Sequence, residues 1–208
     1  MKILKEACVG NFKEAKRAYE LGADRLELCD NLKEGGTTPS YGTILLAKET
    51  LKLAINVMIR PRGSSFVFTE EEIKIMEKDI ELCREAKVNG VVIGALTEDN
   101  RIDEKALKRL IKKSEKLSVT FHMAFDEIED KKVALDKLIE LGIDRVLTKG
   151  GQGSAVDNQQ TLKELVNYAD NRIIILAGGG ITQDNCRELV KNTGIKEVHG
   201  TKIVGKLV

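Results

Sequence analysis

The stretch Glu20-Leu-Gly-Ala-Asp-Arg-Leu-Glu-Leu28 recurs along this chain, and its recurrence decides the fold. A close copy reads Glu140-Leu-Gly-Ile-Asp-Arg-Val-Leu-Thr148, and weaker copies read Asn192-Thr-Gly-Ile-Lys-Glu-Val-His199 and Ala86-Lys-Val-Asn-Gly-Val-Val-Ile93. In each copy a helix ends, Gly or Asn provides a left-handed cap, and a strand begins. Joins of this kind spread along a chain indicate repeated α-to-β units.

The stretches between these joins alternate between strand and helix patterns. The sequence predicts strands near 3–8, 25–29, 54–60, 90–94, 118–122, 144–148, 172–177 and 196–200. Helical patterns span 11–21, 70–87, 103–117, 130–141, 157–169 and 182–192. Alternating β and α elements form a parallel sheet, and eight strands in 208 residues favour a single (β/α)8 TIM-type barrel over a doubly wound sheet. We therefore expect one α/β domain over residues 1–208.

The end of the chain predicts an unusual barrel. After the eighth strand, too few residues remain before Val208 for a full eighth helix. We expect the last helix to be incomplete or missing. The groove between the last and first strands would then be covered by a bent tail or by a partner subunit in a homo-oligomer.

Composition excludes several classes of protein. The net charge of +1 gives no bulk attraction to nucleic acid or to anionic lipid. No apolar run approaches the ~20 residues of a membrane span, and the charged start lacks the apolar core of a signal peptide. The four cysteines form no CxxC pair, which favours reduced thiols. We expect a cytoplasmic protein.

Strand parity predicts a polar barrel interior. Alternate residues of a barrel strand point inward, which selects Glu6, Cys8, Arg25, Glu27, Cys29, Asn56, Met58, Arg60, Thr120, His122, Val146, Thr148, Glu197, His199 and Thr201. Buried charges are costly unless they are paired. The acidic and basic side chains therefore form either a structural ion-pair network or a functional site, and structural networks can mimic active sites.

Charged residues near the carboxyl ends of the strands form a candidate catalytic cluster at the barrel mouth, where barrel enzymes place their active sites. Its members are Glu6, Glu27, Arg60, Arg62, His122 and Asp126. Arginine suits carboxylate or phosphate oxygens, and Glu27 or His122 suits a general base.

A candidate ligand site follows strands seven and eight, whose loops commonly bind phosphate in barrels. Its residues are Gly178, Gly179, Gly180, His199 and Thr201. One alternative is therefore an uncharacterised enzyme acting on a small phosphorylated or carboxylated metabolite. The reaction class does not follow from these residues.

The most specific stretch is Asp24-Arg-Leu-Glu-Leu-Cys-Asp-Asn-Leu-Lys-Glu-Gly-Gly-Thr-Thr-Pro-Ser40, a strand, a glycine-rich loop and a helix start. Together with Ile59-Arg-Pro-Arg-Gly-Ser-Ser-Phe66 and Val119-Thr-Phe-His-Met-Ala-Phe-Asp126, it resembles the CutC copper-homeostasis family. Shorter matches cover almost the whole chain in order: Glu6-Ala-Cys8, Arg145-Val-Leu-Thr148, Ala177-Gly-Gly-Gly180 and Glu197-Val-His199.

This resemblance implies a TIM-type barrel with an incomplete helix ring, often an oligomer, in a cytoplasmic protein linked to copper handling. The family has no settled catalytic activity, so enzyme function stays open. The cysteines proposed as Cu(I) ligands in the family fall on Cys8 and Cys29, which parity also turns inward. Thiolates suit Cu(I), and Met58 offers a third soft atom. Alternatively, both cysteines fill the core, as free buried cysteines usually do.

The sequence departs from the family pattern at three places. Met123 stands where the family has Arg, Lys149 stands where Ser is common, and the family's tail beyond strand eight is largely missing. An anion contact from that arginine cannot be carried over. Lys149 invites a Schiff-base role, but parity turns it away from the Thr148 side, which favours a solvated lysine.

Overall fold

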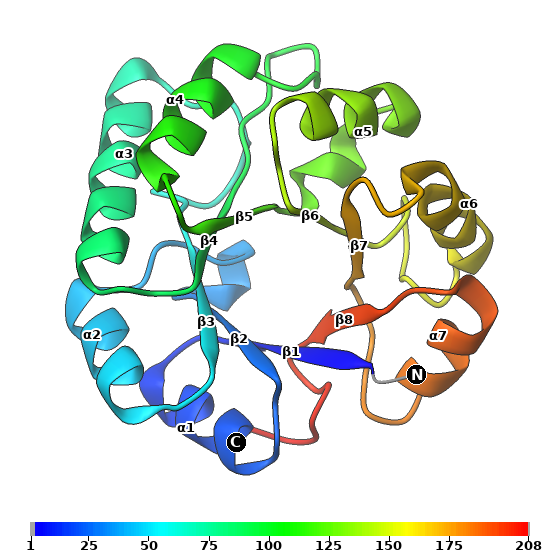
Figure 1. Cartoon of the computed structure of the whole chain (residues 1–208), viewed down its shortest axis with the longest axis horizontal. Coiled ribbons are helices and arrows are strands. Elements are labelled where there is room, and N and C mark those ends of the chain that lie inside the picture. The colour runs from blue at the N-terminus through cyan, green and yellow to red at the C-terminus, as the bar shows by residue number, and fades with distance from the viewer. Residues whose placement is uncertain (1–2, 208) are drawn as a thin grey trace.

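A closed barrel of parallel strands forms the centre of the computed structural model, which describes residues 3–207 (Figure 1). Each strand pairs with the next along the chain, and β8 pairs with β1 to close the barrel. The strands are β1 (Leu4–Val9), β2 (Arg25–Leu28), β3 (Ala54–Met58), β4 (Gly90–Ile93), β5 (Ser118–Phe121), β6 (Arg145–Thr148), β7 (Ile174–Ala177) and β8 (Glu197–Gly200). The predicted TIM-type barrel is confirmed.

Helices surround the barrel as an outer ring (Figure 1). They are α1 (Phe12–Glu20), α2 (Tyr41–Thr50), α3 (Glu70–Glu85), α4 (Glu104–Ser114), α5 (Lys131–Glu140), α6 (Gln159–Ala169) and α7 (Cys186–Thr193). Short polar side chains begin several of them; Thr69 and Glu72, for example, form a reciprocal capping box at α3.

For α2 the sequence indicated only where the helix starts, and α7 begins later than predicted. The Asp24–Ser40 motif indicated a helix start, and α2 follows it from Tyr41 with Ser40 as its cap. The last helix begins at Cys186 rather than at 182, because the segment before it turns: Asn185 Oδ1 accepts from the Thr182 amide, and the Gln183 amide donates to Lys202 O.

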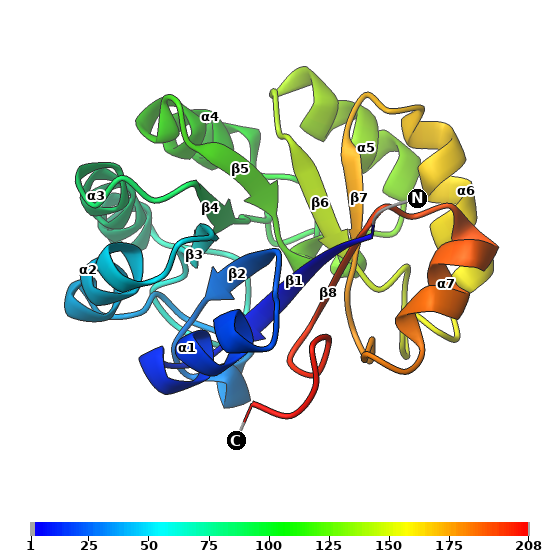
Figure 2. The same ribbon diagram turned by 60° about the horizontal axis from the view of Figure 1, so that its bottom comes forward.

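The chain after β8 forms turns in its described part and runs between α7 and α1 (Figure 2). Ile203, Val204 and Leu207 of this tail are buried in the apolar core. A missing eighth helix was predicted, and a bent tail is the cover that the structure shows over this side of the barrel.

Strand parity assigns most interior positions correctly but fails on β6. Val146 packs in the apolar core that the helices cover. Arg145 instead lies beside the inward-facing Thr120 in register and places its Nε 3.4 Å from Glu197 Oε2. Paired residues of adjacent parallel strands point to the same face of the sheet, so Arg145 points inward as Thr120 does. The predicted inward position of Val146 is therefore wrong.

Candidate functional site

An ion network closes the lower interior of the barrel. The Arg25 guanidinium donates to Glu6 Oε2 and to Glu197 Oε2, and Asn56 Nδ2 donates to Glu6 Oε2 at 3.4 Å. Burial acts to raise the pKa of Glu6, but the hydrogen bond with His199 and the charge of Arg25 outweigh it and lower this pKa to about 2. Arg25 and Glu197 thus form the ion-pair network that parity suggested, with Glu6 as its upper member, and the structure adds Arg145, whose Nε lies 3.4 Å from Glu197 Oε2.

His199 on β8 connects this network to the mouth. Its Nδ1 lies 2.9 Å from Glu6 Oε1, and its Nε2 lies 3.6 Å from Glu27 Oε2. Burial acts to lower the pKa of His199, but the charge of Glu27 and the contacts with Cys8 and Glu6 raise it well above its usual value. The closure of β8 on β1 makes Glu6 and His199 direct register partners, which brings the two residues together.

The thiols of Cys8 and Cys29 converge on one carboxylate oxygen. Glu27 Oε2 lies 3.3 Å from Cys8 Sγ and 3.4 Å from Cys29 Sγ. The contact with Cys29 and the nearby His199 lower the pKa of Cys8, whereas the contact with Cys8 and burial raise that of Cys29. Burial raises the pKa of Glu27. The surroundings therefore shift the pKa values of the two neighbouring thiols in opposite directions, down for Cys8 and up for Cys29.

Met58 completes a small sulfur-rich cluster. Cys8, Cys29, Met58 and Val92 pack together as a separate buried group, with Leu32 against it. A Cβ at Gly36, whose φ is +89°, would lie 3.4 Å from Cys29 Sγ and 3.5 Å from Met58 Cε. The glycine-rich loop after β2 therefore lies directly against the sulfurs, in a backbone conformation that glycine adopts without strain.

This arrangement fits Cu(I). The ion prefers soft thiolate and thioether ligands, and three sulfur-bearing side chains share one buried cluster. The predicted pairing of Cys8 with Cys29, and the nearness of Met58, agree with the geometry.

Arg60 and His122 lie together on another part of the mouth. The Phe66 ring separates them, 4.7 Å from the Arg60 guanidinium carbon and 4.9 Å from the His122 ring centre. Arg60 donates to three loop carbonyls, those of Glu34, Gly36 and Ser64. It therefore holds the loops after β2 and β3 in place.

His122 is held as a neutral imidazole. Its Nδ1 accepts from the Ala124 amide at 3.2 Å, so its ring proton lies on Nε2. Burial, with the charge of Arg60, lowers its pKa to about 3. Within residues 3–207, Nε2 of His122 and Oε1 of Glu27 are buried without a hydrogen-bond partner.

Arg62 and Asp126 complete the predicted catalytic cluster, and the structure places both away from the sulfurs. Arg62 pairs with Glu72 at the start of α3 through two hydrogen bonds. Asp126 accepts from the Thr148 hydroxyl and from the Lys149 amide, which ties β5 to β6. Of the six predicted members, Glu6 and Glu27 lie together with His199.

A cavity of about 320 Å³ opens at the mouth beside the sulfurs. It is lined by Cys8, Met123, Gly179, Gly180, Ile181, Thr182, His199, Gly200, Thr201 and Lys202. Four of the five predicted ligand residues line it; the fifth, Gly178, packs against Leu147, Met123 and His199 instead. Met123 occupies part of this wall.

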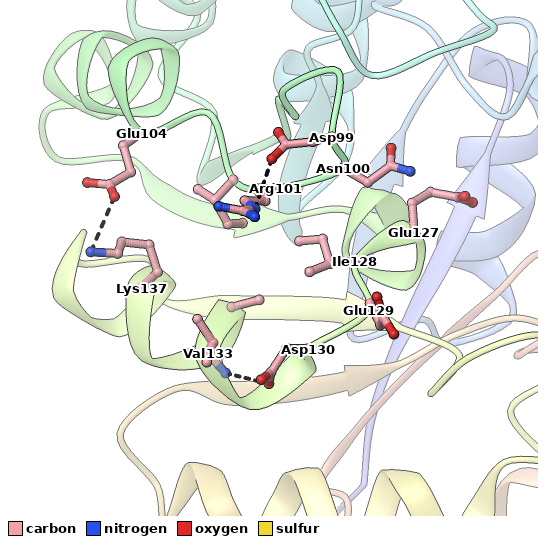
Figure 3. A pocket seen from close by; sticks show the side chains of 12 residues that line it. Asp99, Asn100, Arg101, Glu104, Glu127, Ile128, Glu129, Asp130, Val133 and Lys137 are labelled. Carbon is pink, nitrogen blue, oxygen red and sulfur yellow. Dashed lines mark hydrogen bonds and ion pairs between the residues drawn. The ribbon is translucent and has the colours of Figure 1, made fainter.

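A larger cavity of about 700 Å³ lies outside the mouth, between the loop before α4 and the start of α5 (Figure 3). Several of its charged side chains have partners: Glu104 with Lys137 at 3.3 Å and Asp99 with Arg101 at 2.9 Å. Asp130 caps α5 through the amides of Lys132 and Val133. Its size therefore reflects a groove between helices in which several polar groups are already paired.

The site missed by sequence reasoning is the convergence of His199 with Cys8 and Glu27. One ligand atom from each lies within 4.8 Å of the others. His199 was predicted to contact a ligand, but not as a neighbour of the cysteines. The alternation of residues in β8 predicted that His199 points inward. The sequence does not indicate which residue of β1 lies beside it.

Comparison with known proteins identifies relatives over the whole barrel. The family model described as CutC family matches residues 3–204. A CutC family protein of Parabacteroides distasonis is 50% identical over 200 residues, covering 96% of this chain and 82% of the relative. The human copper homeostasis protein cutC homolog is 42% identical over 196 residues, covering 94% of this chain and 72% of the relative.

Solved structures agree. A CutC protein from Streptococcus agalactiae superposes with a TM-score of 0.93 at 42% identity, covering 97% of this chain and 99% of that one. An aldolase, QR15, at 14% identity and a TM-score of 0.73, shares the fold alone. Within residues 3–207, no helix is long and apolar enough to cross a bilayer. From the match of the family model and the identity to these relatives, this chain belongs to the CutC family.

Proposed function

We propose that this protein acts in copper homeostasis by holding Cu(I) between the sulfurs of Cys8 and Cys29, with the Met58 thioether as a third soft donor. The observation that carries the proposal is the approach of both thiols to Glu27 Oε2, at 3.3 and 3.4 Å. The ion is cargo here, and the sulfurs are the groups that bind it.

Two features of the surroundings support a cargo site. The barrel interior excludes water from the sulfurs, since Cys8 and Cys29 are buried. Cys8 also lines the mouth cavity, so one sulfur can be reached from outside. A buried pair with a single accessible member suits capture at Cys8 followed by closure of Cys29 on the ion.

Anaerobic titration with Cu(I) against a competing chelator tests the proposal. We expect stoichiometric binding by the wild type and its loss in the Cys8→Ser/Cys29→Ser double variant. Cys83→Ser is the matched control, because Cys83 is buried in the core that the helices cover. Equal binding by the double variant and the control would overturn the proposal.

One alternative function has a specific observation in its favour. The mouth cavity combines the bare amides of Gly179 and Gly180 with Thr201 and the cation Lys202, which suits a small phosphorylated or carboxylated molecule. In that case Glu27 is the candidate base, since its Oε1 is unpaired among the described residues. The predicted arginines, Arg60 and Arg62, do not line this cavity.

Inorganic phosphate distinguishes the alternative. If the cavity takes an anion, phosphate raises the melting temperature of the wild type, and Lys202→Gln reduces the rise while the Cys8→Ser/Cys29→Ser double variant keeps it. No rise with phosphate or with a panel of phosphorylated metabolites would remove this alternative.

We further propose that the protein is cytoplasmic and forms a homo-oligomer. The tail after β8 lies between α7 and α1 in place of a helix and buries Ile203, Val204 and Leu207, and a partner subunit would pack against the outer face of this tail (Figure 2). Sedimentation velocity at micromolar concentration tests the oligomer, and a single monomeric species would contradict it.

A further inference from the structure

We propose that Cys8, Glu27 and His199 form a second, distinct donor set, which binds a divalent cation of the Zn²⁺ type and leaves one coordination position open toward the mouth cavity. The set holds one sulfur, one oxygen and one nitrogen, from β1, β2 and β8. Borderline divalent ions accept such mixed donors, whereas Cu(I) prefers sulfur alone.

The distances between the donor atoms suit a tetrahedral ion. Ligand bonds of 2.0 to 2.3 Å at tetrahedral angles separate the donors by about 3.3 to 3.8 Å. Cys8 Sγ lies 3.3 Å from Glu27 Oε2, and His199 Nε2 lies 3.6 Å from the same oxygen. All three atoms lie within 4.8 Å of one another, so small side-chain rotations complete the set.

The histidine is oriented as metal-binding histidines are. Glu6 Oε1 lies 2.9 Å from Nδ1, which fixes the ring and leaves Nε2 directed at the site. A carboxylate on the far ring nitrogen is the usual partner of a ligating histidine. Glu6 is itself held by Arg25, so the orientation rests on the structural network below.

Glu27 gives an independent indication of a missing partner. Its side chain is almost fully buried, and its Oε1 finds no hydrogen-bond partner in the described part of the chain. A buried carboxylate oxygen left without a partner is costly. A cation that bound this carboxylate through both of its oxygens would satisfy it.

Three protein ligands leave a fourth position open, which is the arrangement of zinc sites that bind substrate or water. Cys8 and His199 both line the 320 Å³ cavity, together with Gly179 and Gly180. The open position therefore faces a pocket with bare backbone amides. Water or a small anion is the exogenous ligand that this pocket would hold.

The two donor sets share Cys8 and exclude each other. Cys29 and Met58 belong to the Cu(I) set alone, whereas Glu27 and His199 belong to the divalent set as direct ligands. The divalent site does not rest on Cu(I) binding, and each set has residues whose loss affects it alone.

Titration of the reduced protein with Zn²⁺ against a chromophoric chelator, repeated with Co²⁺ in the spectrophotometer, tests the inference. We expect a Co²⁺ complex with thiolate charge-transfer absorption and the intense d–d bands of four-coordinate cobalt. Glu27→Gln and His199→Gln should weaken Zn²⁺ binding by about 100-fold or more, and Glu6→Gln, which acts through His199, by about 10- to 100-fold. Cys29→Ser should keep Zn²⁺ binding and Cys83→Ser should bind as the wild type does.

The outcomes separate the two sites. Loss of Zn²⁺ binding in His199→Gln with retained Cu(I) binding supports the inference, with melting curves of the metal-free variants as the check on folding. If His199→Gln fails to fold, the isosteric Glu27→Gln and the wild-type Co²⁺ spectrum decide. Three results would overturn the divalent site without affecting the Cu(I) proposal. The wild type would fail to bind Zn²⁺, its cobalt complex would be six-coordinate without thiolate absorption, or Cys29→Ser and Glu27→Gln would lose Zn²⁺ binding equally.

Discussion

Cys8 Sγ lies 3.3 Å from Glu27 Oε2, and the two residues are direct register partners on the paired strands β1 and β2. The backbone ladder, rather than a loop, therefore sets their separation. Sites built on strands hold their geometry more closely than sites on loops. We infer that the donor groups are pre-positioned before any ion arrives.

Acid should weaken the fold through Glu6. Its folded pKa of about 2 lies below the ordinary value of 4.5, so its stabilisation is fully present above pH 4.5 and is lost as the pH falls toward 2. The shift corresponds to on the order of 3 kcal/mol in the free energy of unfolding. Denaturant unfolding between pH 7 and pH 3 measures it.

Glu6→Gln supplies the comparison. The variant should be less stable at pH 7 by about 3 to 5 kcal/mol, because Arg25 loses a buried partner. The free energy of unfolding of the variant should also fall less steeply as the pH decreases, so that the stability curves of variant and wild type approach each other near pH 3. Parallel curves would mean that Glu6 does not carry this pH dependence.

The two histidines should differ in charge in the metal-free protein. Burial and Arg60 lower the pKa of His122 to about 3, whereas the neighbouring acidic groups raise that of His199 above 6.5. Imidazole ¹H–¹⁵N spectra at pH 7 should show one neutral ring with its proton on Nε2 and one protonated ring. Assignment is direct, because the chain has two histidines and His122→Gln removes one signal. Titration of His122 near pH 6.5 would contradict this account.

Gly94 should not tolerate a side chain. A Cβ there would lie 2.6 Å from His122 Nδ1, and the ring cannot retreat because Phe66 and the Ala124 amide hold it. Gly94→Ala should cost about 1 to 3 kcal/mol of stability.

Gly42→Ala is the matched control for that change. Gly42 lies in α2, and a Cβ there would meet no atom of the described chain within 4 Å. Alanine should stabilise the helix by up to about 1 kcal/mol. Thermal melts compare the two variants, and equal effects would count against the close contact at His122.

Local patterns were enough to predict the barrel. The Gly-capped joins before β2 and β6 and the alternation of strands and helices set its class, because caps and periodicity are local properties. Parity on β1 and β2 correctly turned Cys8, Glu27 and Cys29 inward.

The long-range register could not be predicted. Arg145 was assigned to no interior position, because two adjacent apolar residues in β6 permit either facing and the pairing with β5 decides between them. His199 meets Glu6 through barrel closure between β8 and β1. Glu6 and His199 lie too far apart in the sequence for a local pattern to indicate their contact. The donor set of Cys8, Glu27 and His199 therefore becomes visible only in the structure.

Copper K-edge X-ray absorption on the Cu(I)-loaded protein tests the central claim most directly. We expect a first shell of sulfur from Cys8, Cys29 and Met58, without the outer-shell scattering of an imidazole ring, and the loss of this shell in Cys29→Ser. A first shell of nitrogen or oxygen with imidazole scattering from His199 would contradict the assignment of Cu(I) to the sulfur set.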